Sequence, residues 1–336
     1  MRHYVSYYLK MTSSSDNKHI VAITGANGFI GKSLVSALSR NSNISLRLLV
    51  RKHSDNILKS PNIEQVKGDL TKPESLKKFL TPGCTVINLA YSYNSTSEQN
   101  IAAVANLINI CKEHQIKRLI HCSTAAVFGR VNNDVINENT LCNPRSEYGV
   151  TKLLIEDMFF KESKGNYEFV NLRPTAVFGA DGQALIKLIM SLRKGNKILN
   201  YLRSCLFSTR KLNLVSVNNV TAAIVFVIQA DADTINGETF IISEDNEPSN
   251  NFKYVEDYLH EKFVGDVYRL PRIKIPLIIL SWLLRLLGRD SSNPYQVYDS
   301  QKIVDAGFKH VATLDSELSN FVAWYKSEMI EHNPNN

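Results

Sequence analysis

The stretch Ile20-Val21-Ala22-Ile23-Thr24-Gly25-Ala26-Asn27-Gly28-Phe29-Ile30-Gly31 decides the fold of this 336-residue chain. Its short apolar run predicts a buried strand, and apolar residues at helical spacing follow from Phe29 onward. The three glycines allow a tight turn, close approach of the backbone to a pyrophosphate, and packing of a helix on the strand. The N-terminus of that helix then faces the anion. We therefore expect a dinucleotide site formed by Gly25, Asn27, Gly28, Phe29, Ile30 and Gly31.

Strand-like and helix-like patterns alternate through the first half of the chain. The strand-like runs cover residues 20–24, 46–50, 63–67, 85–90, 118–123 and 168–173. Helical periodicity covers residues 29–40, 74–80, 98–114 and 147–163. This alternation predicts an α/β fold of the Rossmann type, with a doubly wound parallel sheet covered by helices on both faces. Ligands bind such sheets at the carboxyl ends of the strands, where the sequence places Leu89, Ala90, Ser123 and Thr124.

The second half of the chain is less regular and predicts a division into two lobes. We expect residues 19–180 to form the dinucleotide-binding domain, and residues 207–230 to return to it and complete its sheet. Residues 181–206 and 231–330 should form a smaller C-terminal lobe that binds the substrate. Residues 1–18 are polar and aromatic, which predicts a disordered extension.

Residues 273–287 are the most apolar stretch of the chain. Lys274, Pro276 and Arg285 interrupt the stretch, and it is too short to span a bilayer. A buried or partner-facing helix is the first interpretation, and a helix lying on a membrane surface is the alternative.

Tyr148 and Lys152 lie four residues apart, so a helix presents them on one face. A cation beside a phenol stabilises the phenolate and lowers the phenol pKa. The hydroxyl of Thr124 could hold a substrate oxygen against that phenol. These three residues are therefore the expected catalytic group, which moves a proton on and off a carbinol oxygen.

Composition restricts the partners of the chain. The net charge of +7 comes from 39 basic and 32 acidic residues. No dense basic run with interleaved aromatic residues is present, so nucleic acid is not an expected partner. The five scattered cysteines lack metal-ligand spacing, so we expect no metal and a reduced, cytoplasmic protein.

These residues together resemble the extended short-chain dehydrogenase/reductase family, specifically its NAD-dependent epimerase/dehydratase group. The resemblance extends over residues 19–325 and rests on the glycine turn and five further motifs. These are Gly68-Asp69-Leu70, Asn88-Leu89-Ala90, Ser123-Thr124-Ala125-Ala126-Val127-Phe128-Gly129, Tyr148-Gly149-Val150-Thr151-Lys152 and Arg173-Pro174-Thr175-Ala176-Val177-Phe178-Gly179.

The resemblance implies a role for each matching residue. Asp69 would hold the adenine amino group, and Leu70 would pack on the adenine ring. Leu89 and Ala90 would contact the cofactor, and Ser123 would contact the substrate beside Thr124. Lys152 would bind the nicotinamide ribose and lower the pKa of Tyr148, the general acid/base. A homodimer through the helices at 98–114 and 147–163 is also implied.

The end of the second strand bears on the choice of cofactor. A carboxylate there binds the 2′-hydroxyl of NAD, whereas an arginine accommodates the 2′-phosphate of NADP. Val50 is followed by Arg51, Lys52 and His53, and Arg51 presents a guanidinium where the phosphate would lie. We therefore favour NADP over NAD.

Within this family, the residues after Thr124 narrow the chemistry. Nucleotide-sugar 4,6-dehydratases carry an Asp-Glu pair there, whereas this chain has Ala125 and Ala126, so dehydration is not expected. Reduction of a ketone and epimerisation at C4 both remain. The order of motifs in the second half resembles that of enzymes acting on UDP-linked 6-deoxy-hexosamines, which makes a nucleotide sugar the expected substrate.

Two departures keep other substrates open. Leu212 stands where the family commonly has a diphosphate-binding arginine, and Gln183 stands near the place of an expected asparagine. Arg210 and Lys211 are the candidates to bind the diphosphate instead. The alternatives are an NADP-dependent reductase of a small non-nucleotide carbonyl compound and a non-catalytic NADP-binding regulatory protein.

Overall fold

The computed structural model describes residues 18–53, 57–265 and 293–332, together with residues 268, 270–273, 279, 282 and 286. The predicted disordered extension at 1–18 lies almost wholly outside these ranges, as does most of the apolar stretch. A seven-stranded sheet, in the order β10-β7-β5-β4-β1-β2-β3, forms the larger lobe. All six pairings are parallel. The strands are β1 (His19–Thr24), β2 (Ile44–Val50), β3 (Ile63–Lys67), β4 (Thr85–Asn88), β5 (Arg118–Cys122), β7 (Glu168–Pro174) and β10 (Glu238–Ile242).

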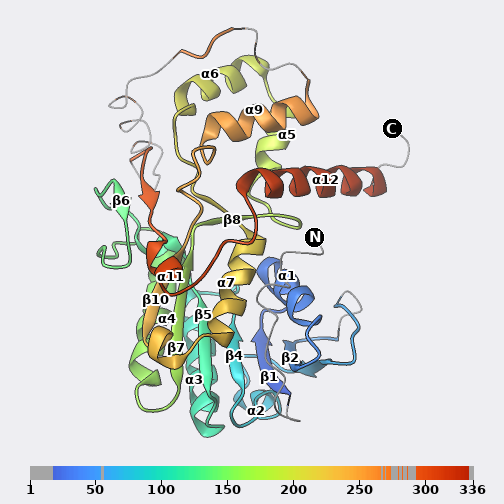
Figure 1. Ribbon diagram of the computed structural model, residues 1–336, viewed down its shortest axis with the longest axis vertical. Helices are drawn as coiled ribbons and strands as arrows, with labels where there is room; N and C mark the ends of the chain where they lie inside the picture. Colours follow the sequence, from blue (N-terminus) through green and yellow to red (C-terminus); the bar gives the residue numbers. More distant parts are fainter. Residues whose placement is uncertain are drawn as a thin grey trace.

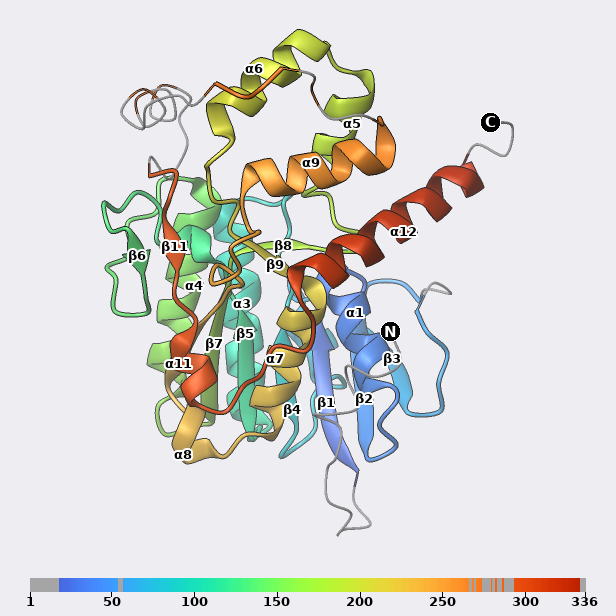
Figure 2. The same ribbon diagram turned by 45° about the horizontal axis from the view of Figure 1, so that its top comes forward.

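Helices cover both faces of this sheet (Figures 1 and 2). Side chains alternate between the faces of a strand, and β1 shows the consequence. Val21 and Ile23 join the core beneath α1 (Phe29–Leu38) and α7 (Val217–Gln229). Ala22 joins the core beneath α3 (Ser97–Glu113) and α4 (Glu147–Ser163). The predicted Rossmann-type, doubly wound parallel fold is therefore confirmed.

The strand that completes the sheet differs from the predicted one. We expected residues 207–230 to supply it, but β9 (Leu214–Ser216) pairs with β8 (Ala176–Phe178) in a separate two-stranded sheet. The seventh strand is β10, from the range assigned to the substrate lobe. The physical reason is that Ser216 ends β9 and at once caps α7, so the segment enters the helix instead of running along β7.

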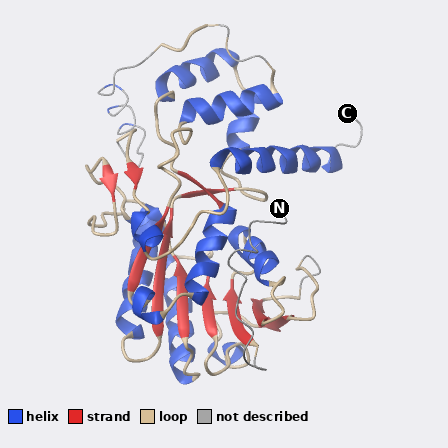
Figure 3. Ribbon diagram, viewed as in Figure 1, coloured by secondary structure: helices blue, strands red, loops and turns tan. Residues whose placement is uncertain are grey.

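The smaller lobe lies beyond the carboxyl ends of the strands, which point towards it in Figure 3. Its core, around Phe178, Leu259 and Phe321, is built from the first, third and fourth of the lobe's four described helices. The four helices are α5 (Ile186–Lys194), α6 (Lys197–Phe207), α9 (Phe252–Phe263) and α12 (Leu314–His332). The remaining elements are α2 (Pro73–Leu76), the 3-10 turn η1 (Ala125–Val127), β6 (Val135–Ile136), α8 (Ala232–Ile235), β11 (Val297–Tyr298) and α11 (Gln301–Asp305). The sequence had predicted no helix at α6.

Candidate active site

The glycine turn between β1 and α1 leaves no room for side chains. Gly25 has φ +75°, and a Cβ there would lie 2.8 Å from the backbone nitrogen of Ala90. A Cβ on Gly31 would lie 2.2 Å from the carbonyl oxygen of Gly25. Gly28 caps α1 without any side-chain hydrogen bond, so the first N–H groups of the helix have no side-chain acceptor. Such a helix start fits the pyrophosphate of a dinucleotide.

A cavity of about 580 Å³ opens beside this turn. Eight of the predicted cofactor residues line it: Gly25, Asn27, Gly28, Arg51, Asp69, Leu70, Leu89 and Ala90. The other five, which are Phe29, Ile30, Gly31, Tyr148 and Lys152, do not line it. A Cβ on Gly182 would lie 2.8 Å from the ring of Phe29, which puts this ring against the turn after β8. Ile30 packs into the core of the sheet.

One end of the cavity contains Arg51, Asp69 and Leu70, the residues predicted to meet the adenosine part of the cofactor. We call it the adenosine end. Asp69 Oδ1 accepts from the backbone N–H and the hydroxyl of Thr71, each at 2.9 Å. The backbone N–H of Thr71 is the main cause that lowers the Asp69 pKa, and the positive charge of Arg51 adds to it. The Leu70 carbonyl accepts from Asn106 Nδ2 at 2.9 Å. A charged carboxylate and an exposed guanidinium therefore lie at the same end of the cavity.

The three predicted catalytic residues come together at the carboxyl ends of the strands. Ser146 caps α4 by accepting from the backbone N–H of Gly149 at 3.2 Å, which holds Tyr148 in the first turn of the helix. Thr124 is close enough to the Tyr148 hydroxyl to lower the pKa of that phenol. Lys152 is buried one turn further along, and its Nζ donates to the Cys122 carbonyl oxygen at 2.8 Å.

The direction of the Tyr148 pKa differs from the predicted one. Burial is the main cause that raises it, the Tyr93 hydroxyl raises it further, and the hydrogen bond with Thr124 lowers it. Lys152 is not among these causes, and its ammonium group donates to the Cys122 carbonyl. Burial lowers the pKa of Lys152 to about 8. In this structure, Tyr148 is therefore a neutral phenol.

Two further tyrosines pack against Tyr148, and the sequence did not identify either of them. The ring of Tyr91 meets Tyr148 edge-on, with centroids 4.9 Å apart, and the ring of Tyr93 stacks on it at 5.5 Å. Both tyrosines line the cavity. The signal was present in Tyr91-Ser92-Tyr93, directly after the strand end at Asn88-Leu89-Ala90.

A buried polar chain joins three strand ends below the site. Thr24 Oγ1 donates to Asn88 Oδ1 at 2.7 Å, and Asn88 Nδ2 lies 3.1 Å from His121 Nδ1. Burial lowers the His121 pKa well below its usual value, and the charge of Lys152 lowers it further. The imidazole is therefore neutral and accepts from Asn88, which fixes the ends of β1, β4 and β5 relative to one another.

Of the four predicted substrate residues, Thr124 lies at the Tyr148 hydroxyl, whereas the side chains of Ser123, Arg210 and Lys211 have other surroundings. Ser123 is buried, and its backbone N–H donates to the Leu172 carbonyl oxygen at 2.7 Å. Lys211 Nζ donates to the Asp245 carbonyl oxygen at 3.3 Å. The Arg210 guanidinium lies 5.8 Å from the centroid of the Phe207 ring. None of these three side chains lines the cavity.

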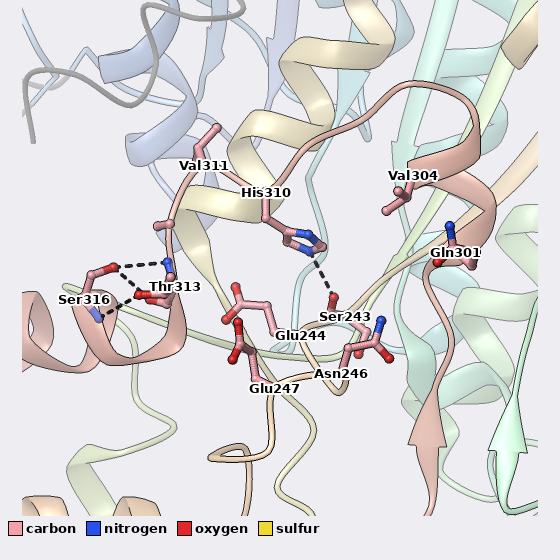
Figure 4. Close-up of a pocket in the computed structure, with 11 residues that line it drawn as sticks. Ser243, Glu244, Asn246, Glu247, Gln301, Val304, His310, Val311, Thr313 and Ser316 are labelled. Carbon is pink, nitrogen blue, oxygen red and sulfur yellow. Dashed lines mark hydrogen bonds between the residues drawn. The ribbon is translucent and has the colours of Figure 1, made fainter.

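A second cavity of about 410 Å³ lies past the end of β10 (Figure 4). Glu244 Oε1 accepts there from the backbone N–H of Ser216 at 2.9 Å and from Asn219 Nδ2 at 2.6 Å. His310 Nε2 donates to the Ser243 carbonyl oxygen at 3.1 Å. These contacts attach β10 and the segment before α12 to the start of α7, and no predicted site residue lines the cavity.

The described part of the chain lacks two further kinds of site. It holds no group of three or more His, Cys, Asp or Glu side chains that could bind a metal ion. No described helix is long and apolar enough to cross a membrane.

Comparisons with known proteins place these features in context. The family model described as "NAD dependent epimerase/dehydratase family" matches residues 21–243. A 2-alkyl-3-oxoalkanoate reductase of Stenotrophomonas maltophilia is 25% identical over 66% of this chain and 70% of its own length. A decarboxylating sterol-4-alpha-carboxylate 3-dehydrogenase of Saccharomyces cerevisiae is 25% identical over 67% of this chain and 70% of its own. Two other curated relatives align over only 54% and 57% of their lengths.

Solved structures share the whole architecture. A UDP-glucose 4-epimerase of Thermotoga maritima, solved with UDP-glucose, superposes with a TM-score of 0.70. It is 17% identical, and the match covers 92% of this chain and 99% of that chain. At this identity, the likeness shows the fold alone.

Proposed function

We infer the function of this chain from its family: it belongs to the NAD dependent epimerase/dehydratase family, whose members are enzymes of the extended short-chain dehydrogenase/reductase type. We propose that it is a nicotinamide-dependent reductase that converts a ketone to a secondary alcohol. The observation that carries the proposal is the protonated Tyr148 phenol, whose hydroxyl lies beside Thr124, one helical turn before the buried Lys152.

Reduction of a ketone needs a proton donor at the carbonyl oxygen. NADH or NADPH, when bound, supplies the hydride to the carbonyl carbon. Thr124 would hold the carbonyl oxygen, and the Tyr148 hydroxyl would donate its proton to that oxygen. Because burial keeps the phenol protonated, Tyr148 already has the form that reduction requires. Lys152 would bind the nicotinamide ribose, and Arg51 at the adenosine end supports NADP as the preferred cofactor.

The substrate is proposed to be a carbonyl compound without a nucleotide. Arg51 is the one Lys or Arg among the residues described as lining the cavity, and it lies at the adenosine end. Tyr91 and Tyr93 line the end near Tyr148. Lys211 donates to a backbone carbonyl instead, and Leu212 cannot bind a diphosphate. The two curated relatives described above act, by their names, on an alkyl-oxoalkanoate and a sterol carboxylate.

A nucleotide sugar remains the second candidate, as a substrate for reduction or for 4-epimerisation. It is supported by the match of both lobes to a structure solved with UDP-glucose. Epimerisation would use the same Thr124, Tyr148 and Lys152. Dehydration is not proposed, because Ala125 and Ala126 cannot move a proton.

Two measurements separate these candidates. The purified protein is first analysed for retained nicotinamide cofactor, and then assayed with NADPH or NADH and two carbonyl compounds, a 2-alkyl-3-oxoalkanoate and a UDP-linked 4-keto-6-deoxy sugar. The proposal predicts exchangeable cofactor, consumption of reduced cofactor with the first compound, and no rise in melting temperature with UDP. Tightly retained NAD together with turnover of the UDP-sugar alone would contradict it and support the epimerase.

We also propose a homodimer through α3 and α4. The two helices pack side by side, and α4 leaves Val150 and Leu154 exposed. Analytical ultracentrifugation of the protein and of a Leu154→Glu variant tests this, with loss of the dimer expected in the variant. A wild-type monomer would contradict the proposal.

A further inference from the structure

The small lobe exposes an apolar helix face that no described element covers. On α6, the exposed fractions are 69% for Ile198, 65% for Leu199 and 54% for Leu202. Residues three and four apart share one face of a helix, so the three side chains form one patch. Monomeric proteins rarely expose such groups of large apolar side chains without a partner.

The chain after α9 extends this patch. The Tyr201 hydroxyl of α6 donates to the Pro271 carbonyl oxygen at 2.8 Å. Leu270 and Ile273, on either side of this contact, are both exposed. Figures 1 and 2 both show residues 270–273 beside α6 at the end of the molecule farthest from the sheet. We call Ile198, Leu199, Leu202, Leu270 and Ile273 the α6 surface.

The sequence around the α6 surface is basic. Residues 182–211 contain no Asp or Glu, and they contain seven basic residues: Lys187, Arg193, Lys194, Lys197, Arg203, Arg210 and Lys211. Lys187, Lys194 and Lys197 are exposed, and the described residues offer none of them an ion pair. Arg272 is instead neutralised on the inner side, by Glu256 and Asp257 of α9.

We propose that the α6 surface docks the protein on an anionic lipid bilayer. Apolar side chains on one helix face with lysines around them are the features that hold a helix in the plane of a membrane interface. Anionic lipids attract such lysines, each by roughly a fivefold change in partition. A second copy of the chain is a poorer occupant, because a two-fold contact would place like-charged rims against each other.

The docking is peripheral and separate from the proposed catalysis. No described helix could span the bilayer, and none of the five residues of the α6 surface lines the cofactor cavity. The inference therefore stands whichever substrate the enzyme reduces.

Co-sedimentation of the full chain with lipid vesicles tests the proposal. One set of vesicles contains phosphatidylcholine alone, and the other contains phosphatidylcholine and phosphatidylglycerol. We expect binding to the anionic vesicles that weakens as ionic strength rises. The double variant Leu199→Glu/Leu202→Glu should bind at least roughly tenfold more weakly. The variant Lys194→Ala/Lys197→Ala should lose roughly fivefold per lysine on anionic vesicles only.

Leu141→Glu is the matched control, because Leu141 is 85% exposed and lies in the loop between β6 and α4. It introduces the same carboxylate away from the α6 surface and should bind vesicles as the wild type does. Circular dichroism and sedimentation without lipid verify that each variant is folded and report its oligomeric state. The proposal is overturned if the wild type ignores anionic vesicles, if Leu141→Glu weakens binding equally, or if the α6 variants only dissociate a dimer.

Discussion

The substitution Tyr148→Phe removes the hydroxyl that would donate the proton and keeps the ring that packs on its neighbours. In Tyr148→Phe the ring remains, so its contacts with Tyr91 at 4.9 Å and Tyr93 at 5.5 Å should persist. A positioned proton donor contributes about 10²–10⁴-fold to a rate, which corresponds to about 3–5 kcal/mol of the activation barrier. We therefore expect kcat to fall by roughly this factor.

The effect of the same substitution on stability should be much smaller. The lost hydroxyl has Thr124 and Tyr93 as its polar neighbours, and a hydrogen bond to such a neighbour contributes about 1 kcal/mol net. Burial of that hydroxyl carries a desolvation cost that the variant avoids. The net change in the free energy of unfolding should therefore stay below about 2 kcal/mol, too little to explain a lost activity by unfolding.

Three measurements on the purified variant test this argument: consumption of reduced nicotinamide, the Kd for the cofactor, and the melting temperature. Tyr93→Phe is the matched control. The Tyr93 hydroxyl raises the Tyr148 pKa, so its loss should lower that pKa. Burial is the main cause that keeps the phenol protonated and remains in this variant, so turnover at neutral pH should survive. Wild-type kcat in Tyr148→Phe would refute the assignment of the proton donor.

Three further predictions concern buried and exposed charges. Burial lowers the pKa of Lys152 from 10.5 to about 8. Between these pH values the unfolded chain binds more protons than the folded chain, so the free energy of unfolding should rise with pH. A Lys152→Met variant should lack this rise when its denaturation is measured as a function of pH. If Arg51 meets a 2′-phosphate, Arg51→Gln should weaken NADP binding by roughly 10–100-fold and leave NAD binding unchanged in calorimetry. The Arg173 guanidinium and the Glu156 carboxylate form a buried pair at 2.6 Å, so Glu156→Gln should destabilise the fold by about 3–5 kcal/mol in urea denaturation, and Glu156→Leu with Arg173→Met should recover part of that loss.

The parts of the fold that sequence predicts well are those fixed by local backbone needs. At Gly25 and Gly31, a side chain would collide with backbone atoms, so glycine at both positions indicates the turn directly. The strand before it contains the continuous apolar run Ile20-Val21-Ala22-Ile23, as strands of parallel sheets with two buried faces commonly do. These local features were enough to identify the doubly wound sheet and the edge that carries the site.

Strand order at the far edge was not predictable in the same way. β9 and β10 are both short and apolar, and periodicity alone cannot tell which of them joins β7. Which strand pairs with β7 depends on contacts between residues far apart in the sequence, such as the Thr175 N–H that donates to the Ile242 carbonyl oxygen at 3.0 Å. Helix α6 was also missed, although the sequence contains a signal for its start. Asn196 caps the helix by accepting from the N–H groups of Ile198 and Leu199.

The direction of the Tyr148 pKa could not come from spacing. Positions four apart place Tyr148 and Lys152 on one helix face, but the spacing does not fix where a long, flexible side chain ends. Here the Lys152 ammonium is held by the Cys122 carbonyl, and the neighbours that act on the phenol come from the loop after β4. Tyr91 and Tyr93 are distant in sequence from Tyr148, so only the folded chain brings them together.

This loop also bears on what the enzyme accepts. Tyr93 is 78% exposed and stacks on Tyr148, so a substrate that approaches the Tyr148 hydroxyl meets an aromatic face before it meets the proton donor. An aromatic face favours apolar carbon over a hydrated diphosphate, because only the apolar group gains from leaving water. The neutral phenol and its aromatic surroundings therefore favour the same conclusion, which is proton donation to the oxygen of an apolar ketone.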